Sequence, residues 1–228
     1  MARRESRFLK QQKMAVGVAL VIILGVMVYL STLLVSDVPG GEFVEGEHYT
    51  LLENPRRIRG DKIEIMEFFS YGCIHCYNFD DDLADWVEAH EDTITFIRTP
   101  VLANELWRNY GRAYYAMEEL GMLEENHARL FREVHDGRKI LGSADKLASL
   151  LASGDVSQES IATAYSSTIV NQKIARADSL SRRFKIATVP NVVVNGKYLV
   201  KSTREVGLAR MLDVMDYLIE KETQPEAD

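Results

Sequence analysis

Two cysteines separated by two residues are the side chains of this sequence whose type and spacing point most directly to chemistry. Cys73 and Cys76 are the only cysteines of the chain, and they follow a short apolar segment, residues 63–69, that Gly72 ends. A Cys-x-x-Cys pair at the point where a strand gives way to a helix is typical of a dithiol redox centre. The free N–H groups and the dipole of the first helical turn would stabilise a thiolate at Cys73. Cys76, one turn further in, would be the resolving thiol.

Two titratable residues accompany the cysteines. His75 can stabilise a thiolate electrostatically, although it could also be a spacer. Glu67 would point to solvent if its strand lay at the edge of a sheet, and it would be buried near the cysteines if the strand lay inside. The alternative for the cysteines is half of a zinc site. The other half would come from four histidines that show no paired spacing: His48, His90, His127 and His135.

The elements around the cysteines predict a β-α-β unit. Residues 63–69 form the first strand, and residues 94–101 form the second. The helix between them has an apolar face made of Cys76, Phe79, Leu83, Trp86 and Val87. We interpret the Asp80-Asp81-Asp82 run as part of a solvated helix face.

The rest of the chain predicts a helical block and then a hairpin. Residues 103–184 carry apolar stripes with helical spacing, which Gly121 and Gly154 interrupt. Strand character returns at residues 188–194, and Asn195-Gly196 is a strong hairpin turn before residues 197–200. Ser202-x-x-Glu205 has the pattern of a capping box that would open the last helix.

Several separated motifs resemble the DsbA family of thiol–disulfide oxidoreductases, over about residues 43–221. In chain order the motifs are Gly46-x-x-Tyr49-x-x-Leu52, Glu67-Phe68-Phe69-Ser70, Cys73-Ile74-His75-Cys76-Tyr77, Val189-Pro190 and Val193-Val194-Asn195-Gly196-Lys197-Tyr198. The resemblance implies an α/β, thioredoxin-like fold formed by residues 43–102 and 185–221. Residues 103–184 would then be a helical domain inserted between its two halves.

The resemblance also implies a role for each residue of the dithiol site. Cys73 is the nucleophile that forms a mixed disulfide with the substrate, and Cys76 is its resolving partner. His75 favours the thiolate of Cys73. Glu67 is similar to the buried acid that the family has beneath its active site.

Three further residues are expected to contact the substrate. Pro190 looks like the cis-proline that faces the disulfide in this family, and the backbone of Val189 would pair with an extended substrate chain. Ile74 stands where the best-known members have a proline, and Tyr71-Gly72 replaces an aromatic pair. Because residues between the cysteines tune the redox potential, these departures leave the reaction class intact and the strength of oxidation open.

A membrane anchor is expected before this domain. Residues 14–35 carry no charge, and they exceed the about 20 residues that a spanning helix needs. The basic residues of segment 1–13 place the N-terminus in the cytoplasm and the catalytic domain in the periplasm. We expect an uncleaved, single-pass signal anchor in the bacterial inner membrane, then a linker, residues 36–42, and a polar tail, residues 222–228. A cleaved signal peptide is the alternative, although its apolar region is usually about 7–15 residues long.

The charge balance narrows the choice of partners. The formal net charge is −7, and the basic residues gathered in segment 1–13 leave the rest of the chain still more acidic. This distribution argues against nucleic-acid binding. No dimerisation segment is evident, so we expect a monomer.

Together these observations predict an oxidase that donates the Cys73–Cys76 disulfide to reduced or unfolded exported proteins. The reaction would need no organic cofactor or metal. The resemblance implies that a quinone-linked membrane protein similar to DsbB reoxidises the cysteines. The alternatives are a disulfide reductase or isomerase, and a non-catalytic anchored module that binds extended peptides.

Overall fold

The computed structural model describes residues 14, 16–18, 20–27, 29, 43–203 and 206–223. The chain divides into two units, Met1–Glu42 and Phe43–Asp228. The described residues of the first unit are helical. Among the residues that the structure describes, no helix is long and apolar enough to cross a membrane. The rest of segment 14–35 lies outside the described residues, as do segments 1–13 and 36–42 and residues 224–228.

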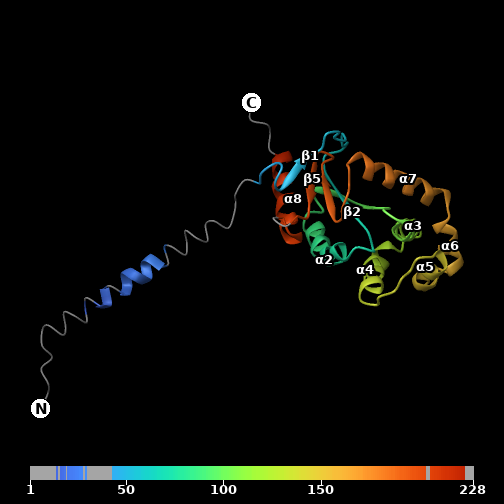
Figure 1. Ribbon diagram of the computed structural model, residues 1–228, viewed down its shortest axis with the longest axis horizontal. Helices are drawn as coiled ribbons and strands as arrows, with labels where there is room; N and C mark the ends of the chain where they lie inside the picture. The colour runs from blue at the N-terminus through green and yellow to red at the C-terminus, as the bar shows by residue number, and fades with distance from the viewer. Residues whose placement is uncertain are drawn as a thin grey trace, which may run out of the picture. The chain divides into compact units, whose positions relative to one another are not determined.

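The second unit is organised around a sheet that has five strands in its described part (Figure 1). The strands are β1 (Tyr49–Leu51), β2 (Ile63–Phe69), β3 (Ile94–Pro100), β4 (Asn191–Val194) and β5 (Tyr198–Lys201). Their order in the sheet is β1-β5-β4-β2-β3. Strand β2 runs parallel to β3 and antiparallel to β4. The predicted β-α-β unit and the later hairpin are therefore confirmed.

Helices cover both faces of this sheet. The helices described in this unit are α2 (Ile74–Ala89), α3 (Glu105–Glu119), α4 (Leu123–His135), α5 (Ala144–Leu151), α6 (Gln158–Tyr165), α7 (Thr168–Arg183) and α8 (Leu208–Thr223). Helices α2 and α8 share one apolar cluster with Ile65 of β2, whereas Met66 and Phe68 face the other way and pack against Phe184, which follows α7. This alternation is the period of two expected of a strand that is buried on both faces.

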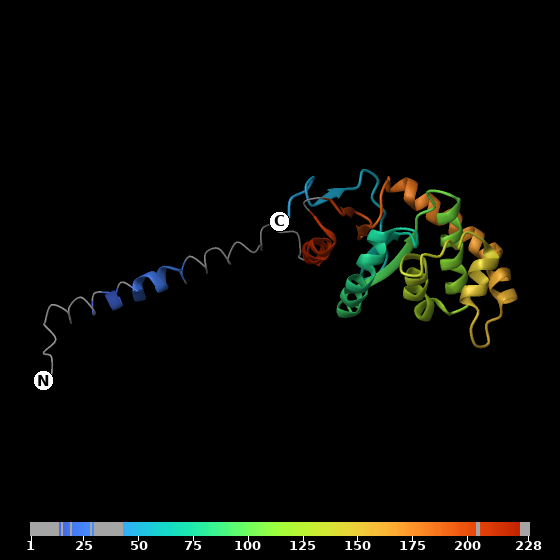
Figure 2. The same cartoon turned by 60° about the horizontal axis from the view of Figure 1, so that its bottom comes forward.

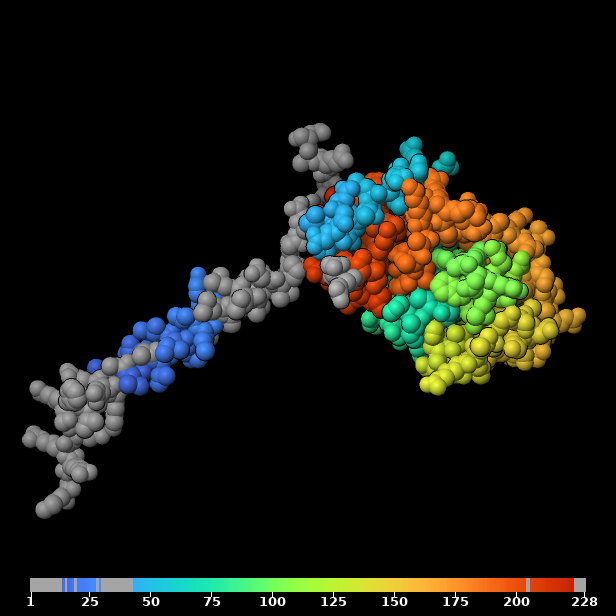
Figure 3. Space-filling model, in the orientation of Figure 1, coloured from blue at the N-terminus to red at the C-terminus, as the bar shows by residue number. Residues whose placement is uncertain are grey.

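Helices α3–α7 follow β3 and precede β4 in the chain, and they form one helical block (Figure 2). In the space-filling view, α4 to α6 (yellow) gather at one end of the second unit, away from β1 (blue) (Figure 3). Serine or asparagine side chains cap four of these helices, because each accepts a hydrogen bond from the first helical turn. The capping residues are Asn104, Ser143, Ser157 and Ser167. The apolar core of this block includes Tyr71, Cys73 and Cys76, so the helical block and the dithiol are packed together.

The hairpin and the last helix differ in detail from the prediction. Asn195 and Gly196 both have positive φ, 49° and 63°, as a two-residue hairpin turn of this kind requires. Strand β4 begins at Asn191 rather than at residue 188, since Pro190 has no N–H to give to a ladder. The last helix does not begin directly after Ser202, as the predicted capping box would require. Helix α8 begins at Leu208. Before it, the Thr203 hydroxyl accepts a hydrogen bond from the N–H of Val206. Glu205 lies outside the described residues.

Candidate active site

The two cysteines lie on the first turn of α2. Cys73 is the N-cap residue of this helix, and its N–H donates to the carbonyl of Ser70 at 3.0 Å. The side chain of Cys73 keeps 9% of its surface exposed, whereas Cys76 is fully buried. Both thiols are in the reduced, unbonded form. The accessible thiol is thus the first of the two, in the position predicted for the nucleophile.

The loop before β4 lies opposite Cys73. The Sγ of Cys73 is 3.5 Å from the carbonyl oxygen of Val189, and the Val189–Pro190 peptide bond is cis. Pro190 is buried and Val189 is half-buried. Ile74 and His75 are exposed beside the thiol. The structure therefore brings together all five of these residues, which come from parts of the chain more than a hundred residues apart.

The surroundings of Cys73 favour its thiolate. A hydrogen bond from the Cys76 thiol contributes most, and it outweighs partial burial, which acts in the opposite direction. The backbone N–H groups of Cys76 and His75 and the charge of His75 add to the effect. Together they lower the pKa of Cys73 from 9.0 to about 6. Cys73 is then largely a thiolate at neutral pH, which is the nucleophilic form and a good leaving group.

The second thiol behaves in the opposite way. Burial, followed by the hydrogen bond and the charge of Cys73, raises the pKa of Cys76 well above its ordinary value. Cys76 therefore stays protonated as long as Cys73 is a thiolate. Two thiols that share one helical turn are thus driven to different protonation states, which is the arrangement expected of a nucleophile and its resolving partner.

Glu67 is buried inside the sheet, with 1% of its surface exposed. Strand β2 lies between β4 and β3, so the solvent-facing alternative is wrong. Burial raises the pKa of Glu67 from 4.5 to about 7, even though the guanidinium of Arg98 opposes the shift. The charge of Cys73 adds to the raised pKa of Glu67, and the charge of Glu67 adds to the raised pKa of Cys76. Glu67 can therefore hold or release a proton at neutral pH.

A buried polar network continues from Glu67 into the helices. The Arg98 guanidinium donates to Glu67 at 3.0 Å and to Asp80 at 2.9 Å. Asp80 also lies 3.0 Å from Nε2 of His127, on α4. Only 6% of Asp80 is exposed, so its assignment to the solvated face of α2 is wrong. Burial disfavours its charge, but His127 and Arg98 together hold the pKa of Asp80 below its ordinary value.

Sequence reasoning missed three members of this network, namely Arg98, Asp80 and His127. Arg98 stands directly beside Glu67 in the parallel register of β2 and β3. An arginine that is the only charged residue of its strand is a signal that a buried acid lies next to it. Asp80 lies four residues after Cys76, so it shares the buried face of α2. For His127, residue spacing alone carries no such signal.

A groove of about 500 Å³ borders the cysteines on the side of the helical block. Val189 and Trp107 are shared between this groove and the surroundings of the dithiol. Its apolar lining comes from the end of β3, the start of α3 and the segment before β4: Val101, Leu102, Ala103, Trp107, Ile186, Ala187 and Val189. Such a surface fits an apolar side chain.

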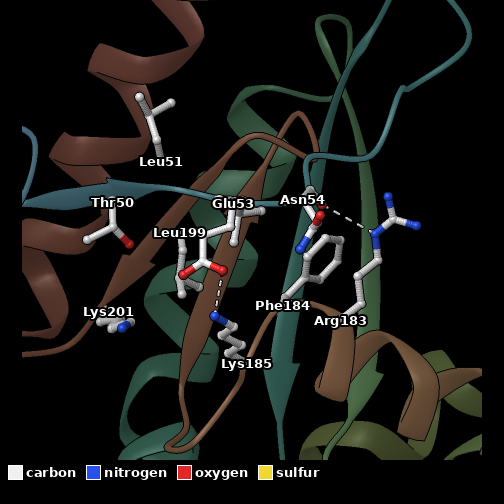
Figure 4. Close-up of a pocket in the computed structure, with 10 residues that line it drawn as sticks. Thr50, Leu51, Glu53, Asn54, Arg183, Phe184, Lys185, Leu199 and Lys201 are labelled. Atoms are coloured by element: carbon white, nitrogen blue, oxygen red, sulfur yellow. Dashed lines mark hydrogen bonds and ion pairs between the residues drawn. The ribbon is translucent and has the colours of Figure 1, made fainter.

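A second hollow, of about 230 Å³, lies between β1, β5 and the end of α7 (Figure 4). Lys185 pairs with Glu53 across it at 2.6 Å, and the Arg183 side chain donates to backbone carbonyls of Asn54 and Pro55. These cations are engaged in holding the segment after β1. Neither cysteine lines this hollow.

The chain is similar to curated proteins over most of its length. No protein-family model matches it. The thiol:disulfide interchange protein DsbA of Pseudomonas aeruginosa is 30% identical over 202 residues, which are 88% of this chain and 96% of that protein. The protein of the same name from Azotobacter vinelandii is 34% identical over 161 residues, which are 71% of this chain and 75% of that protein.

Solved structures agree with these sequence matches. The crystal structure of Pseudomonas aeruginosa DsbA aligns with a TM-score of 0.74 at 31% identity, over 79% of this chain and 94% of that one. The oxidoreductase DsbA from Xylella fastidiosa aligns with a TM-score of 0.74 at 27% identity, over 79% and 98%. The predicted thioredoxin-like fold with a helical domain is thereby confirmed, and this chain belongs to the DsbA family of thiol:disulfide interchange proteins.

Proposed function

We propose that this protein is an oxidase that donates the Cys73–Cys76 disulfide to reduced exported proteins. The observation that carries the proposal is the opposed behaviour of two thiols on one helical turn. The pKa of Cys73 is lowered to about 6, while that of Cys76 is raised. A stabilised Cys73 thiolate stabilises the reduced protein, and this is how DsbA proteins become strong oxidants.

The reaction follows from these protonation states. A substrate thiolate attacks the Sγ of Cys73, the Cys73–Cys76 bond breaks, and Cys76 leaves with the electron pair and takes up a proton. A second substrate thiolate then attacks the substrate sulfur of the mixed disulfide. Cys73 leaves as a thiolate, so it requires no proton above pH 6. The substrate's two thiols have lost two electrons, and the protein has gained them through Cys73 and Cys76 alone.

Glu67 is the proposed proton donor and acceptor for Cys76. A resolving thiol with a raised pKa needs a base when the disulfide forms again and an acid when the disulfide breaks. Glu67 is buried, its charge raises the pKa of Cys76, and its own pKa of about 7 suits both directions. His75 is the proposed electrostatic partner of the Cys73 thiolate.

Substrate binding is assigned to the loop opposite the dithiol. An extended chain would pair with the backbone of Val189, beside Pro190, and contact the exposed side chain of Ile74, which is 48% accessible. The apolar groove next to Val189 would accept a neighbouring side chain of the substrate. Main-chain pairing with side-chain pockets on either side gives affinity for many unfolded sequences.

The cellular setting is also a proposal. Residues 14–35 would anchor the chain in the inner membrane, with its domain in the periplasm, since they are uncharged and follow a basic segment. A quinone-linked membrane protein similar to DsbB would reoxidise the cysteines. The protein would act as a monomer without metal or organic cofactor.

Replacement of the nucleophile tests the activity. The purified full chain, in oxidised form, should oxidise a reduced two-cysteine protein, and Cys73→Ser should abolish this. Cys76→Ser should instead accumulate a mixed disulfide when it is given a protein with an oxidised cysteine pair, because its Cys73 thiolate attacks that disulfide and no second thiol resolves the product. If oxidation survives in Cys73→Ser, or if equilibration with glutathione gives a strongly reducing dithiol, the oxidase assignment is wrong.

Membrane extraction tests the anchor. After expression in bacteria, the protein should resist alkaline extraction from membranes and keep the mass of the whole chain. A soluble periplasmic product that lacks the first 35 residues would instead identify a cleaved signal peptide.

A further inference from the structure

Helix α4 of the helical block contacts Tyr71, the residue two positions before Cys73, at three points. His127, Phe131 and His135 recur every four residues, so they share one face of α4. The hydroxyl of Tyr71 is 2.6 Å from Nδ1 of His127, and its carbonyl oxygen is 2.9 Å from Nε2 of His135. Between them the ring of Phe131 packs 4.8 Å from the ring of Tyr71. The hydroxyl, the ring and the backbone carbonyl of Tyr71 are thus all contacted by one helix.

The protonation of this contact is set by its neighbours. Burial lowers the pKa of His127 and raises that of Tyr71, so both are neutral at pH 7. Because ionised Asp80 faces Nε2 of His127, that nitrogen carries the proton and donates. Nδ1 must then accept from the Tyr71 hydroxyl. A directed chain of hydrogen bonds therefore joins Tyr71 through His127 to Asp80.

The same helix holds the other side of the dithiol. Tyr77, the residue after Cys76, stacks on the ring of His135 with centroids 5.0 Å apart and planes 9° from parallel. Its hydroxyl donates to Asp136 at 2.7 Å. Helix α4 and Asp136, the residue that follows it, therefore contact the chain two residues before Cys73 and immediately after Cys76.

We propose that His127 and His135 are positioning residues of the redox centre, through which the helical block sets the redox equilibrium of the two cysteines. In the oxidised protein the covalent bond to Cys76 fixes the Cys73 sulfur. In the reduced protein only the loop keeps this sulfur next to the donors that stabilise its thiolate. Loosening Tyr71 therefore destabilises mainly the reduced form and makes the protein a weaker oxidant. This inference rests on the proposed oxidase function and extends it to residues outside the thioredoxin-like part.

Two conservative changes test the contact of the Tyr71 hydroxyl with His127 and the contact of the Tyr71 carbonyl with His135. Tyr71→Phe removes the hydroxyl that His127 accepts from, and His135→Phe removes the donor to the Tyr71 carbonyl but keeps a ring for Tyr77. The matched control is Tyr165→Phe, which removes a hydroxyl that donates to Asn109 at 2.7 Å within the helical block, away from the dithiol. His127→Phe and His127→Gln complete the set, since glutamine retains an acceptor and a donor.

Three quantities are measured on each full-length variant: the equilibrium constant with glutathione, the thiolate titration of Cys73 by absorbance, and the unfolding midpoint of the oxidised form. Tyr71→Phe and His135→Phe should each shift the equilibrium constant by about fivefold toward the oxidised protein, as expected for one neutral hydrogen bond. They should also raise the pKa of Cys73. Tyr165→Phe should leave the equilibrium constant and the pKa of Cys73 unchanged, although it should lower the unfolding midpoint about as much as Tyr71→Phe does. His127→Phe should shift the equilibrium constant more than Tyr71→Phe does. His127→Gln should shift it less than His127→Phe does.

The proposal is overturned if Tyr71→Phe and His135→Phe keep the equilibrium constant and the Cys73 titration of the parent, or if Tyr165→Phe shifts them equally. Failure of the oxidase function itself would look different. In that case the unmodified parent would not oxidise a reduced protein, whatever the variants did.

Discussion

The indole ring of Trp107 lies against Gly72, so closely that a Cβ at residue 72 would come 2.5 Å from its Nε1. Helix α3 thereby contacts the residue that precedes the nucleophile. Gly72→Ala should force the indole or the loop to move, lower the free energy of unfolding by about 1–3 kcal/mol and slow substrate oxidation. Denaturant titration and an oxidation assay measure the two effects. Gly207→Ala is the control, because a Cβ there meets nothing within 4 Å. Equal behaviour of the two variants would contradict the importance of this contact.

The Cys76 thiol should matter more than His75 for the acidity of Cys73. A direct hydrogen bond from a buried thiol is not screened by water, whereas the exposed charge of His75 is. Cys76→Ala should therefore raise the pKa of Cys73 further above 6 than His75→Gln does. Titration of thiolate absorbance in the reduced protein compares them. A larger effect of His75→Gln would show that the charge dominates.

The pH dependence of stability should reveal Glu67. The folded protein holds a proton on Glu67 up to a pKa of about 7, whereas an unfolded glutamate releases it near 4.5. The contribution of Glu67 to the free energy of unfolding therefore falls as the pH rises from 4.5 through 7. Glu67→Gln lacks this loss, so its stability relative to the parent should rise over that range by up to about 3 kcal/mol. Denaturant titrations at several pH values, on both reduced proteins, measure the difference; a constant difference would place the pKa of Glu67 near its ordinary value.

Arg98 should be required for folding stability more than for chemistry. It pairs with Glu67 and Asp80, and both carboxylates are buried. Arg98→Met would leave them without a cation and should cost about 3–5 kcal/mol of unfolding free energy. The triple variant with Glu67→Gln and Asp80→Asn should recover part of this loss, because no buried charge then remains unpaired.

A surface arginine provides the comparison for that experiment. Arg182 pairs with Asp178, but its side chain is 69% exposed. Arg182→Met should cost less than about 1 kcal/mol. If the two arginine variants unfolded at the same denaturant concentration, the buried network would not stabilise the fold as described.

Local patterns predicted the parts of this fold that local physics decides. The bounds of β2 follow from a short segment rich in apolar residues that Gly72 ends, and the hairpin follows from the positive φ that Asn195 and Gly196 tolerate. Ser143 is a common type of capping residue, and it caps a helix here because its hydroxyl accepts a hydrogen bond from the N–H of Lys146 in the first turn. The pairing of Cys73 with Cys76 could be predicted without tertiary information, since the two residues lie on one turn of one helix.

The long-range partners of the dithiol could not be predicted in the same way. Asp80 sits among three consecutive aspartates, and only the approach of Arg98 and His127 from other elements makes its burial favourable. The contact between His127 and Tyr71 joins residues 56 positions apart, and no sequence pattern around either residue predicts it. The placement of Val189 and Pro190 opposite Cys73 was available only from the resemblance to a family, not from spacing.

The pairing of Glu67 with Arg98 also bears on how the sheet assembles. The two residues are direct neighbours in the parallel register of β2 and β3, and most of the other residues of these strands are apolar. Apolar residues alone would tolerate a shift of one strand along the other. A slip by one residue would turn Arg98 to the opposite face of the sheet and leave Glu67 buried without its cation. The acid that serves the cysteines therefore also selects one alignment of the two strands among those that hydrophobic burial would accept.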